Sequence, residues 1–247
     1  MEYLQQAFSL QHLLPMLLIF AASFVQSITG FGLIIIAAPF LLMFYDAKLT
    51  ILLVQCVAFC SNIVQTPLLY RDADVRTVAW LALGSCAGLP VGIFIYHSFS
   101  NESLKIAVSI VILLFLLISH YWHPRMQVRG RNSAVTGALS GIMSTTTGMG
   151  GPPLVIYFAY THLVPQVLRA TCVMYFFFGN VTTLGAFVLS GVDLWPAISE
   201  AVYLLPGLAL GLICGHTAFR HVSAVLFRRM VFGILYLACI YTLYSVL

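Results

Sequence analysis

The chain has 247 residues, of which 61% are hydrophobic and 7% are charged, and its mean hydropathy is +1.01. Soluble domains carry about 25% charged residues because polar groups must cover their surface. This composition excludes an ordinary soluble fold and places most of the chain in a lipid bilayer. The net charge of +4 comes from short basic clusters and not from an extended basic face, which excludes nucleic acid as a partner.

Ten apolar runs separated by short polar breaks predict an all-α fold. A helix needs about 20 residues to cross a bilayer, and six runs are long enough: 49–69, 76–97, 104–121, 166–189, 195–218 and 224–246. The other four form two pairs, each with a glycine-containing break between its members: 10–28 with 33–45, and 133–146 with 152–163. We expect each pair to form a helical hairpin that enters and leaves the membrane on the same side.

The two breaks share a motif, which predicts an internal duplication. Thr29-Gly30-Phe31-Gly32 and Thr147-Gly148-Met149-Gly150 both read Thr-Gly-x-Gly and lie 118 residues apart, as do Asn62 and Asn180. Three further pairs match at 119: Asp74 with Asp193, Gly88 with Gly207, and Gly92 with Gly211. The alternative is chance similarity between apolar helices. We expect membrane repeats at 1–122 and 133–247, joined by a basic cytoplasmic linker at 123–132, in one transport domain.

The basic residues predict the orientation of the chain. With hairpins, one side of the membrane receives nine arginines and the other only Lys48 and Lys105; the nine are Arg71, Arg76, Arg125, Arg129, Arg131, Arg169, Arg220, Arg228 and Arg229. Because basic loops stay in the cytoplasm, both termini should lie outside it, in a multi-pass protein of the cell (inner) membrane. If each pair crossed as one broken span, the basic loops at 121–132 and 218–230 would face opposite sides, which disfavours that version.

One hairpin and three crossings in each half would invert the second half relative to the first. The predicted fold is therefore a polytopic membrane protein of two inverted repeats, each a broken-helix hairpin plus three transmembrane helices. Inverted repeats with discontinuous helices are typical of secondary transporters, which hold their substrate near the midplane between the repeats.

The chemistry of the breaks predicts an anion site. A helix that starts inside the membrane presents free backbone N–H groups and the positive end of its dipole, which attract anions. No Lys, Arg, Asp or Glu falls in the middle of an expected span, so neutral donors would complete the site. Small and hydroxylated residues could instead serve only helix packing. The candidate substrate-binding residues are Gln26, Ser27, Thr29, Gly30, Phe31, Gly32, Asn62, Thr146, Thr147, Gly148, Met149, Gly150, Gly151, Tyr157 and Asn180.

Other features of the sequence argue for transport and against catalysis. HExxH, GxSxG, paired buried carboxylates and cofactor motifs are all missing from the sequence, so we expect no cofactor, no metal and no enzymatic activity. Glu200 could couple transport to protons, although an acid also suits a helix N-terminus. Arg169 could draw anions to the cytoplasmic mouth, although an arginine at the end of a span also extends to the interface. The sequence leaves the oligomeric state open.

The stretch Thr147-Gly148-Met149-Gly150-Gly151-Pro152-Pro153-Leu154-Val155-Ile156-Tyr157 resembles the second-repeat signature of the TauE/SafE sulfite exporter family. Thr29-Gly30-Phe31-Gly32, followed by Ala38-Pro39, resembles the first-repeat signature, with Leu33 and Ile34 where further glycines often stand. The resemblance implies a permease for sulfur-containing anions: sulfite, sulfoacetate or larger organosulfonates, including aromatic ones. It also implies coupling to protons. A passive anion channel on the same scaffold, and a transporter of another small anion such as a carboxylate, are the alternatives.

Overall fold

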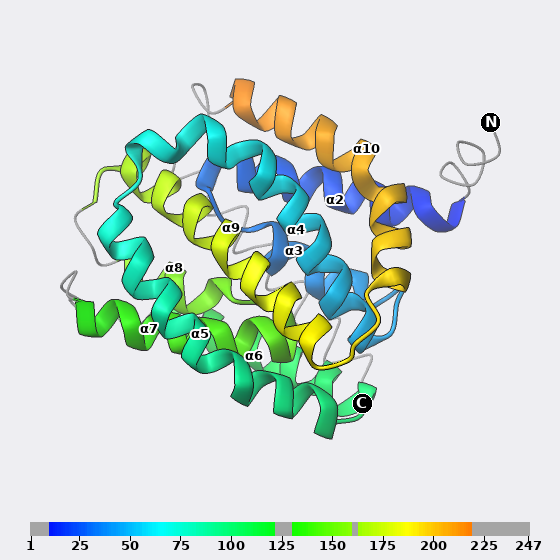
Figure 1. The fold of residues 1–247 in the computed structure, drawn as a ribbon. Helices are drawn as coiled ribbons and strands as arrows, with labels where there is room; N and C mark the ends of the chain where they lie inside the picture. Colours follow the sequence, from blue (N-terminus) through cyan, green and yellow to red (C-terminus); the bar gives the residue numbers. More distant parts are fainter. Residues whose placement is uncertain (1–9, 122–129, 160–162, 219–247) are drawn as a thin grey trace.

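The structure is a computed structural model that describes residues 10–121, 130–159 and 163–218. Every regular element in these ranges is a helix (Figure 1). In chain order the elements are α2 (Leu10–Thr29), α3 (Leu33–Leu41), α4 (Ala47–Leu69), the 3₁₀ turn η1 (Tyr70–Asp72), α5 (Val75–Ser98), α6 (Asn101–Tyr121), α7 (Gly130–Thr147), α8 (Gly151–Ala159), α9 (Pro165–Leu189) and α10 (Trp195–Ala218). The all-α prediction is confirmed for the described residues, and both predicted breaks separate a long helix from a short one.

Five helices of the described ranges are long and apolar enough to cross a membrane, so the chain is a polytopic membrane protein. They cover His12–Thr29, Ala47–Asp72, Val75–Ser98, Gln166–Leu189 and Trp195–Ala218. The first of these, α2, was expected only as one arm of a hairpin, yet its 20 residues would extend about 30 Å. The run 104–121 lies within α6, and the run 224–246 falls outside the described residues.

The helices form three layers (Figure 1). The pair α2 and α10 lies on one flank, the pair α5 and α7 lies on the other, and α4 and α9 pack against each other between them. The short helices α3 and α8 lie inside this frame and contact each other. Each hairpin therefore packs along a helix from the opposite half of the chain.

Glycines allow these outer pairs to pack backbone against backbone. A methyl group at Gly88 of α5 would lie 2.2 Å from the carbonyl oxygen of Ala138 on α7. One at Gly211 of α10 would lie 2.4 Å from that of Phe20 on α2. Such distances leave no room for a side chain, so glycine is required where these helices cross.

The contacts correct the register of the predicted glycine matches. Three glycines of α5 and three of α10 make equivalent contacts: Gly84 with Ala134, Gly88 with Ala138 and Gly92 with Ile142; and Gly207 with Met16, Gly211 with Phe20 and Gly215 with Phe24. The corresponding contacted residues on α2 and α7 are 118 positions apart in the sequence, whereas the corresponding glycines on α5 and α10 are 123 positions apart. The pairing of Gly88 with Gly207 at 119 is therefore wrong by four residues, about one helical turn. The four additional residues lie between Asp193 and Gly207, at the start of α10 and just before it.

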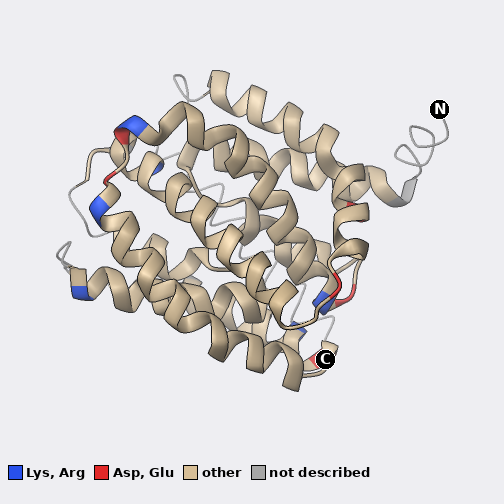
Figure 2. Ribbon diagram, viewed as in Figure 1, with Lys and Arg blue, Asp and Glu red and all other residues tan. Residues whose placement is uncertain are grey.

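Charged residues gather at two ends of the molecule and leave an uncharged belt between them (Figure 2). One end joins η1 to the start of α9, where Gln166 Nε2 donates to Asp72 Oδ2 at 2.9 Å. The other end joins the start of α4 to that of α6, where Lys48 N donates to Asn101 Oδ1 at 3.1 Å. Such a belt is the surface that a bilayer requires.

Candidate functional site

A pocket lies where both short helices begin. Gly32, the residue that caps α3, and Gly151, the first residue of α8, both line it. The first N–H groups of a helix have no partner within the helix and carry its positive dipole end. The pocket is nearly closed in this conformation, with a cavity volume of about 10 Å³, which holds about one water molecule. Its walls are Gln26, Phe31, Gly32, Ile34, Ile35, Ala58, Asn62, Gly151 and Phe176. Five of the predicted site residues therefore meet here: Gln26, Phe31, Gly32, Asn62 and Gly151.

Asn62, which lines this pocket, has a buried side-chain donor without a hydrogen-bond partner. Its Oδ1 accepts a hydrogen bond from Gln26 Nε2 at 3.0 Å, which fixes the orientation of the amide. Its Nδ2 is buried without a hydrogen-bond partner, and the residue is 1% exposed. A buried donor left unpaired costs about 1–3 kcal/mol. A ligand with an acceptor oxygen would remove that cost.

The two breaks are built alike. Thr29 Oγ1 donates to Val25 O at 2.9 Å and accepts from Phe31 N at 3.3 Å. Thr147 Oγ1 donates to Met143 O at 2.8 Å and accepts from Met149 N at 3.3 Å. The Thr29 hydroxyl has a second acceptor in Phe31 O. Because all of these acceptors are nearby backbone carbonyls, both threonines hold the shape of the break instead of pointing a donor at a ligand.

Each break turns at a glycine that packs against the central helix of the other half. Gly30 has φ +82° and Gly148 has φ +72°, a conformation that glycine adopts without a steric penalty. A methyl group at Gly30 would lie 2.6 Å from the carbonyl oxygen of Arg169 on α9. One at Gly148 would lie 3.4 Å from Cα of Ile51 on α4. Ile51 and Arg169 are themselves 118 residues apart, so the two contacts correspond.

Gln55 distinguishes the second break from the first. Its Nε2 donates to Ser144 O at 3.1 Å, to Ser144 Oγ at 2.7 Å and to Gly148 O at 3.2 Å. The position 118 residues later holds Val173, which is fully buried and offers no such donor. Gln55 thus satisfies carbonyl groups of the second break, whereas the first break lies beside an amide that is still free to bind.

Arg169 places a positive charge beside the first break. It is 6% exposed although it lies near the start of α9, so protein covers it, unlike an arginine that extends to the interface. Phe176 of the pocket lies seven residues further along α9, which is two turns and therefore the same face of the helix. Arg169 thus lies on the face that continues into the pocket wall.

The remaining predicted site residues are not among those that line the pocket. Ser27 Oγ donates to Leu212 O at 3.1 Å, and Thr146 Oγ1 donates to Ile142 O at 2.8 Å. Met149 is fully buried in the main apolar core, and Gly150 O accepts from Ser140 Oγ at 2.5 Å. Tyr157 is 1% exposed and its hydroxyl lies 2.9 Å from Ser133 Oγ on α7. These contacts hold the helices around the pocket in place.

Asn180 is a separate case among these residues. It is 2% exposed and its Nδ2 has no hydrogen-bond partner, as in Asn62, but it is not part of the pocket wall. The structure therefore brings one of the two predicted asparagines into the pocket.

Sequence reasoning missed the apolar part of the wall. Ile34, Ile35, Ala58 and Phe176 line the pocket but were not predicted as site residues. One signal was available, because Ala58 and Phe176 are 118 residues apart and each precedes one of the duplicated asparagines by four positions.

Comparison with known proteins identifies the family. The model of the family described as "Sulfite exporter TauE/SafE" matches residues 15–242. The "Probable sulfite/organosulfonate exporter TauE" of Cupriavidus necator is 25% identical over 235 residues, covering 90% of this chain and 91% of that protein. No solved structure matches. Because the family match spans nearly the whole chain, the protein belongs to the TauE/SafE sulfite exporter family.

Proposed function

We propose that the protein is a secondary active transporter of sulfur-containing anions, coupled to protons, in the inner membrane. Its substrates would be sulfonates such as sulfoacetate or aromatic sulfonates, or sulfite. One observation carries the proposal: both short helices begin at a pocket lined by Asn62, whose buried Nδ2 has no hydrogen-bond partner. An oxyanion would supply acceptors to the helix N–H groups and to this amide at once.

The walls of the pocket suit an organic anion with two different ends. Gln26, Asn62 and the two glycines offer donors, while Phe31, Ile35 and Phe176 offer apolar surface. The pocket as it stands has room for about one water molecule, so it would have to widen to admit an organosulfonate. In that wider form the sulfonate group would lie against the donors and its organic part against the aromatic rings. Binding without a fixed charge in direct contact would rest on hydrogen bonds of about 1.5–3 kcal/mol each. Such binding is weak enough for release, as transport requires.

We further propose that the two halves are inverted repeats. The Gly30–Arg169 and Gly148–Ile51 contacts involve residues that are 118 positions apart, and in each break the threonine hydroxyl donates to the carbonyl four residues before it. In Figure 1, α2 and α7 run in opposite directions, as do α4 and α9. These observations support an arrangement in which the substrate site lies between the repeats.

The orientation of the chain is part of the same proposal. Among the described residues, Arg71 lies in η1, and Arg76, Arg131 and Arg169 lie within the first two turns of α5, α7 and α9, which start at one end of the molecule (Figure 1). Lys48 and Lys105 lie within the first two turns of α4 and α6, which start at the other end. The arginine side would be cytoplasmic and both termini would be outside. Arg125, Arg129, Arg220, Arg228 and Arg229 fall outside the described residues.

The proposal is tested by uptake into proteoliposomes that contain the purified protein. Sulfite, sulfoacetate, taurine and toluenesulfonate are each offered with and without a pH gradient. Accumulation above the external concentration in a pH gradient is the expected result for at least one anion. A flux that only equilibrates the substrate would instead identify a passive channel, and no flux of any of these anions would overturn the proposal.

A competition experiment tests the anion site itself. The carboxamide that corresponds to a transported sulfonate lacks the negative charge and two of the three acceptor oxygens. It should compete weakly, because the helix N-termini prefer a charged partner. Competition as strong as that of the parent sulfonate would replace the anion site by an apolar pocket built on Phe31 and Phe176.

A further inference from the structure

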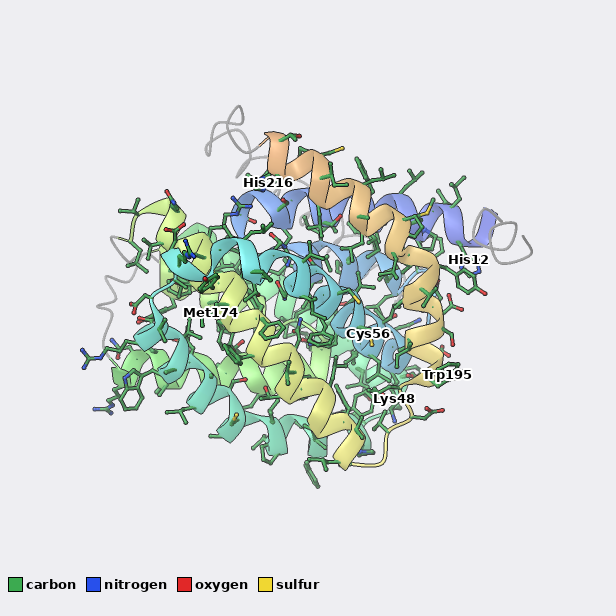
Figure 3. The ribbon with its side chains drawn as sticks, turned by 45° about the horizontal axis from the view of Figure 1, so that its top comes forward. His12, Lys48, Cys56, Met174, Trp195 and His216 are labelled. Carbon is green, nitrogen blue, oxygen red and sulfur yellow. The ribbon has the colours of Figure 1, made fainter. Side chains whose placement is uncertain are left out.

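A cluster of ionisable side chains connects both ends of the first hairpin to α10. Tyr45, which follows α3, donates its hydroxyl to Glu200 Oε2 at 3.0 Å. His12, at the beginning of α2, places Nδ1 3.5 Å from the same oxygen, and its ring stacks on Tyr203 with the centroids 4.7 Å apart. Figure 3 shows His12 beside α10, at the end of the molecule that also carries Lys48 and Trp195. A single carboxylate oxygen thus holds the start and the end of the hairpin.

The cluster has no counterpart in the second half. At the offset of 118, His12 corresponds to Gly130 and Tyr45 corresponds to Leu163. Neither residue can accept or donate through its side chain, so the second hairpin cannot be held in this way. The difference is confined to one end of one hairpin, which points to a function that the two halves do not share.

The geometry of His12 leaves a place for one proton. Nδ1 is buried without a hydrogen bond and faces a carboxylate oxygen, which is an acceptor. A neutral imidazole faces this oxygen as an acceptor if its proton is on Nε2, or as a donor if its proton is on Nδ1, and in both cases the cluster keeps one net negative charge. A second proton makes the ring an imidazolium, which donates from Nδ1 and forms an ion pair with Glu200, so that the net charge of the cluster falls to none. The side chains of His12 and Glu200 are 17% and 27% exposed, so water compensates this negative charge only in part.

Among the described residues at this end, the other charged and titratable groups do not take over that role. Burial, together with the nearby Glu200 carboxylate, raises the pKa of Tyr45 well above its ordinary value of 10.0, so Tyr45 remains a donor. Lys48, at the start of α4, lies over the ring of Tyr96 at 5.4 Å, and Asp46 before it is exposed. Asp193 caps the start of α10 by accepting from Trp195 N at 2.9 Å.

We propose that His12, Tyr45 and Glu200 form a proton-binding site whose protonated form holds both ends of the first hairpin against α10. The first hairpin carries Phe31 and Gly32 of the pocket, so the proton and the anion act on the same element. The geometry stands by itself, but its consequence for coupling rests on the proposed transport function.

The experiment compares the wild type with Glu200→Gln and His12→Phe. Glutamine keeps the shape of the acid and an acceptor for Tyr45, and phenylalanine keeps the stacking on Tyr203; each removes a titrating group. Glu102→Gln, an exposed acid in the first turn of α6, is the matched control. The first measurement is the apparent unfolding temperature of the detergent-purified protein between pH 5.5 and 8.

A protein that binds a proton more tightly when folded becomes more stable as the pH falls, and loses this stability as the pH rises. The wild type and Glu102→Gln should therefore unfold at a higher temperature at pH 6 than at pH 8. Both cluster variants should lose that difference. A wild-type profile that is flat over this range, or a variant profile that follows the wild type, would overturn the proton site. The pH dependence of the unfolding temperature tests the proton site even if no sulfonate is transported.

The second measurement is transport in proteoliposomes. Glu200→Gln should retain exchange of labelled for unlabelled sulfonate at equal pH but lose accumulation driven by a pH gradient, as should His12→Phe. Glu102→Gln should retain both activities. Accumulation at the wild-type level in the two cluster variants would overturn the coupling role, whereas absence of transport in the wild type would count against the proposed function.

Discussion

Phe59 and Phe177 stack on each other in the middle of the molecule, with ring centroids 6.0 Å apart and planes inclined by 24°. They are 118 residues apart, the same separation as Thr29 from Thr147 and Asn62 from Asn180. A side chain that packs on its own counterpart marks the place where a two-fold axis between the halves would pass. The proposed repeats therefore meet at the contact of α4 with α9, within one turn of each asparagine.

Alanine at Gly30 should destabilise the protein more than alanine at Gly148. At Gly30 the new methyl group would meet backbone of Arg169 at 2.6 Å, whereas at Gly148 it would first meet the movable side chain of Val54 at 2.8 Å. Both variants also bear the cost of a positive φ, about 1–2 kcal/mol. Unfolding temperatures of the detergent-purified variants test this order. The control is Gly185→Ala on α9, where the new methyl group would have no other atom within 4 Å. An equal fall in unfolding temperature for Gly30→Ala and Gly185→Ala would contradict the prediction.

Removal of the free amide of Asn62 should weaken substrate binding without loss of folding. One hydrogen bond to a charged ligand contributes about 1.5–3 kcal/mol, so Asn62→Ala should raise the dissociation constant about tenfold or more. Titration calorimetry with the transported anion measures this change. Asn180→Ala removes an equally buried amide that does not line the pocket and should have a smaller effect. An unchanged affinity in Asn62→Ala would place the anion elsewhere.

Gln55→Leu should destabilise the second hairpin by about 1–3 kcal/mol, because the buried carbonyls of Ser144 and Gly148 lose a donor. The matched control is Gln65→Leu on the same helix, since Gln65 donates to Ser61 of its own helix at 3.0 Å. Chemical or thermal unfolding of the two variants measures the difference. Equal unfolding midpoints would show that the Gln55 contacts add nothing to stability.

The two ends of the molecule should be labelled from opposite sides of the membrane. In a cysteine-free background, Ser100→Cys, between α5 and α6, should react with an impermeant maleimide in intact cells. Ala73→Cys, between η1 and α5, should react only after the cells are permeabilised, because it lies at the arginine-rich end. Labelling of Ala73→Cys in intact cells would reverse the proposed orientation.

The sequence predicted the features that depend on local chemistry. Glycine and proline mark where a helix must end, so both breaks and the long helices of the described residues were found from the chain alone. The polar members of the pocket were found because glutamine and asparagine are uncommon in apolar spans. Ala58 was missed because a small apolar residue gives no chemical signal of its position.

The features that depend on long-range packing were not predictable in the same way. Tyr157 follows the second break closely, but the sequence does not say that its hydroxyl lies against Ser133. Thr29 and Thr147 were expected to face an anion, whereas each donates to its own helix. The glycine register failed because comparison at a constant offset cannot detect the four additional residues between Asp193 and Gly207.

The exchange of hairpins between the halves bears on how the protein can fold. The contact glycines of α5 have their partners on α7, and those of α10 have theirs on α2. A half-length chain that ends at residue 122 would retain α5 without the surface that its glycines fit. Such a half would behave like one subunit of a domain-swapped dimer, which becomes complete only when another copy supplies the missing hairpin. In the intact protein the covalent connection from α6 to α7 keeps the two halves together.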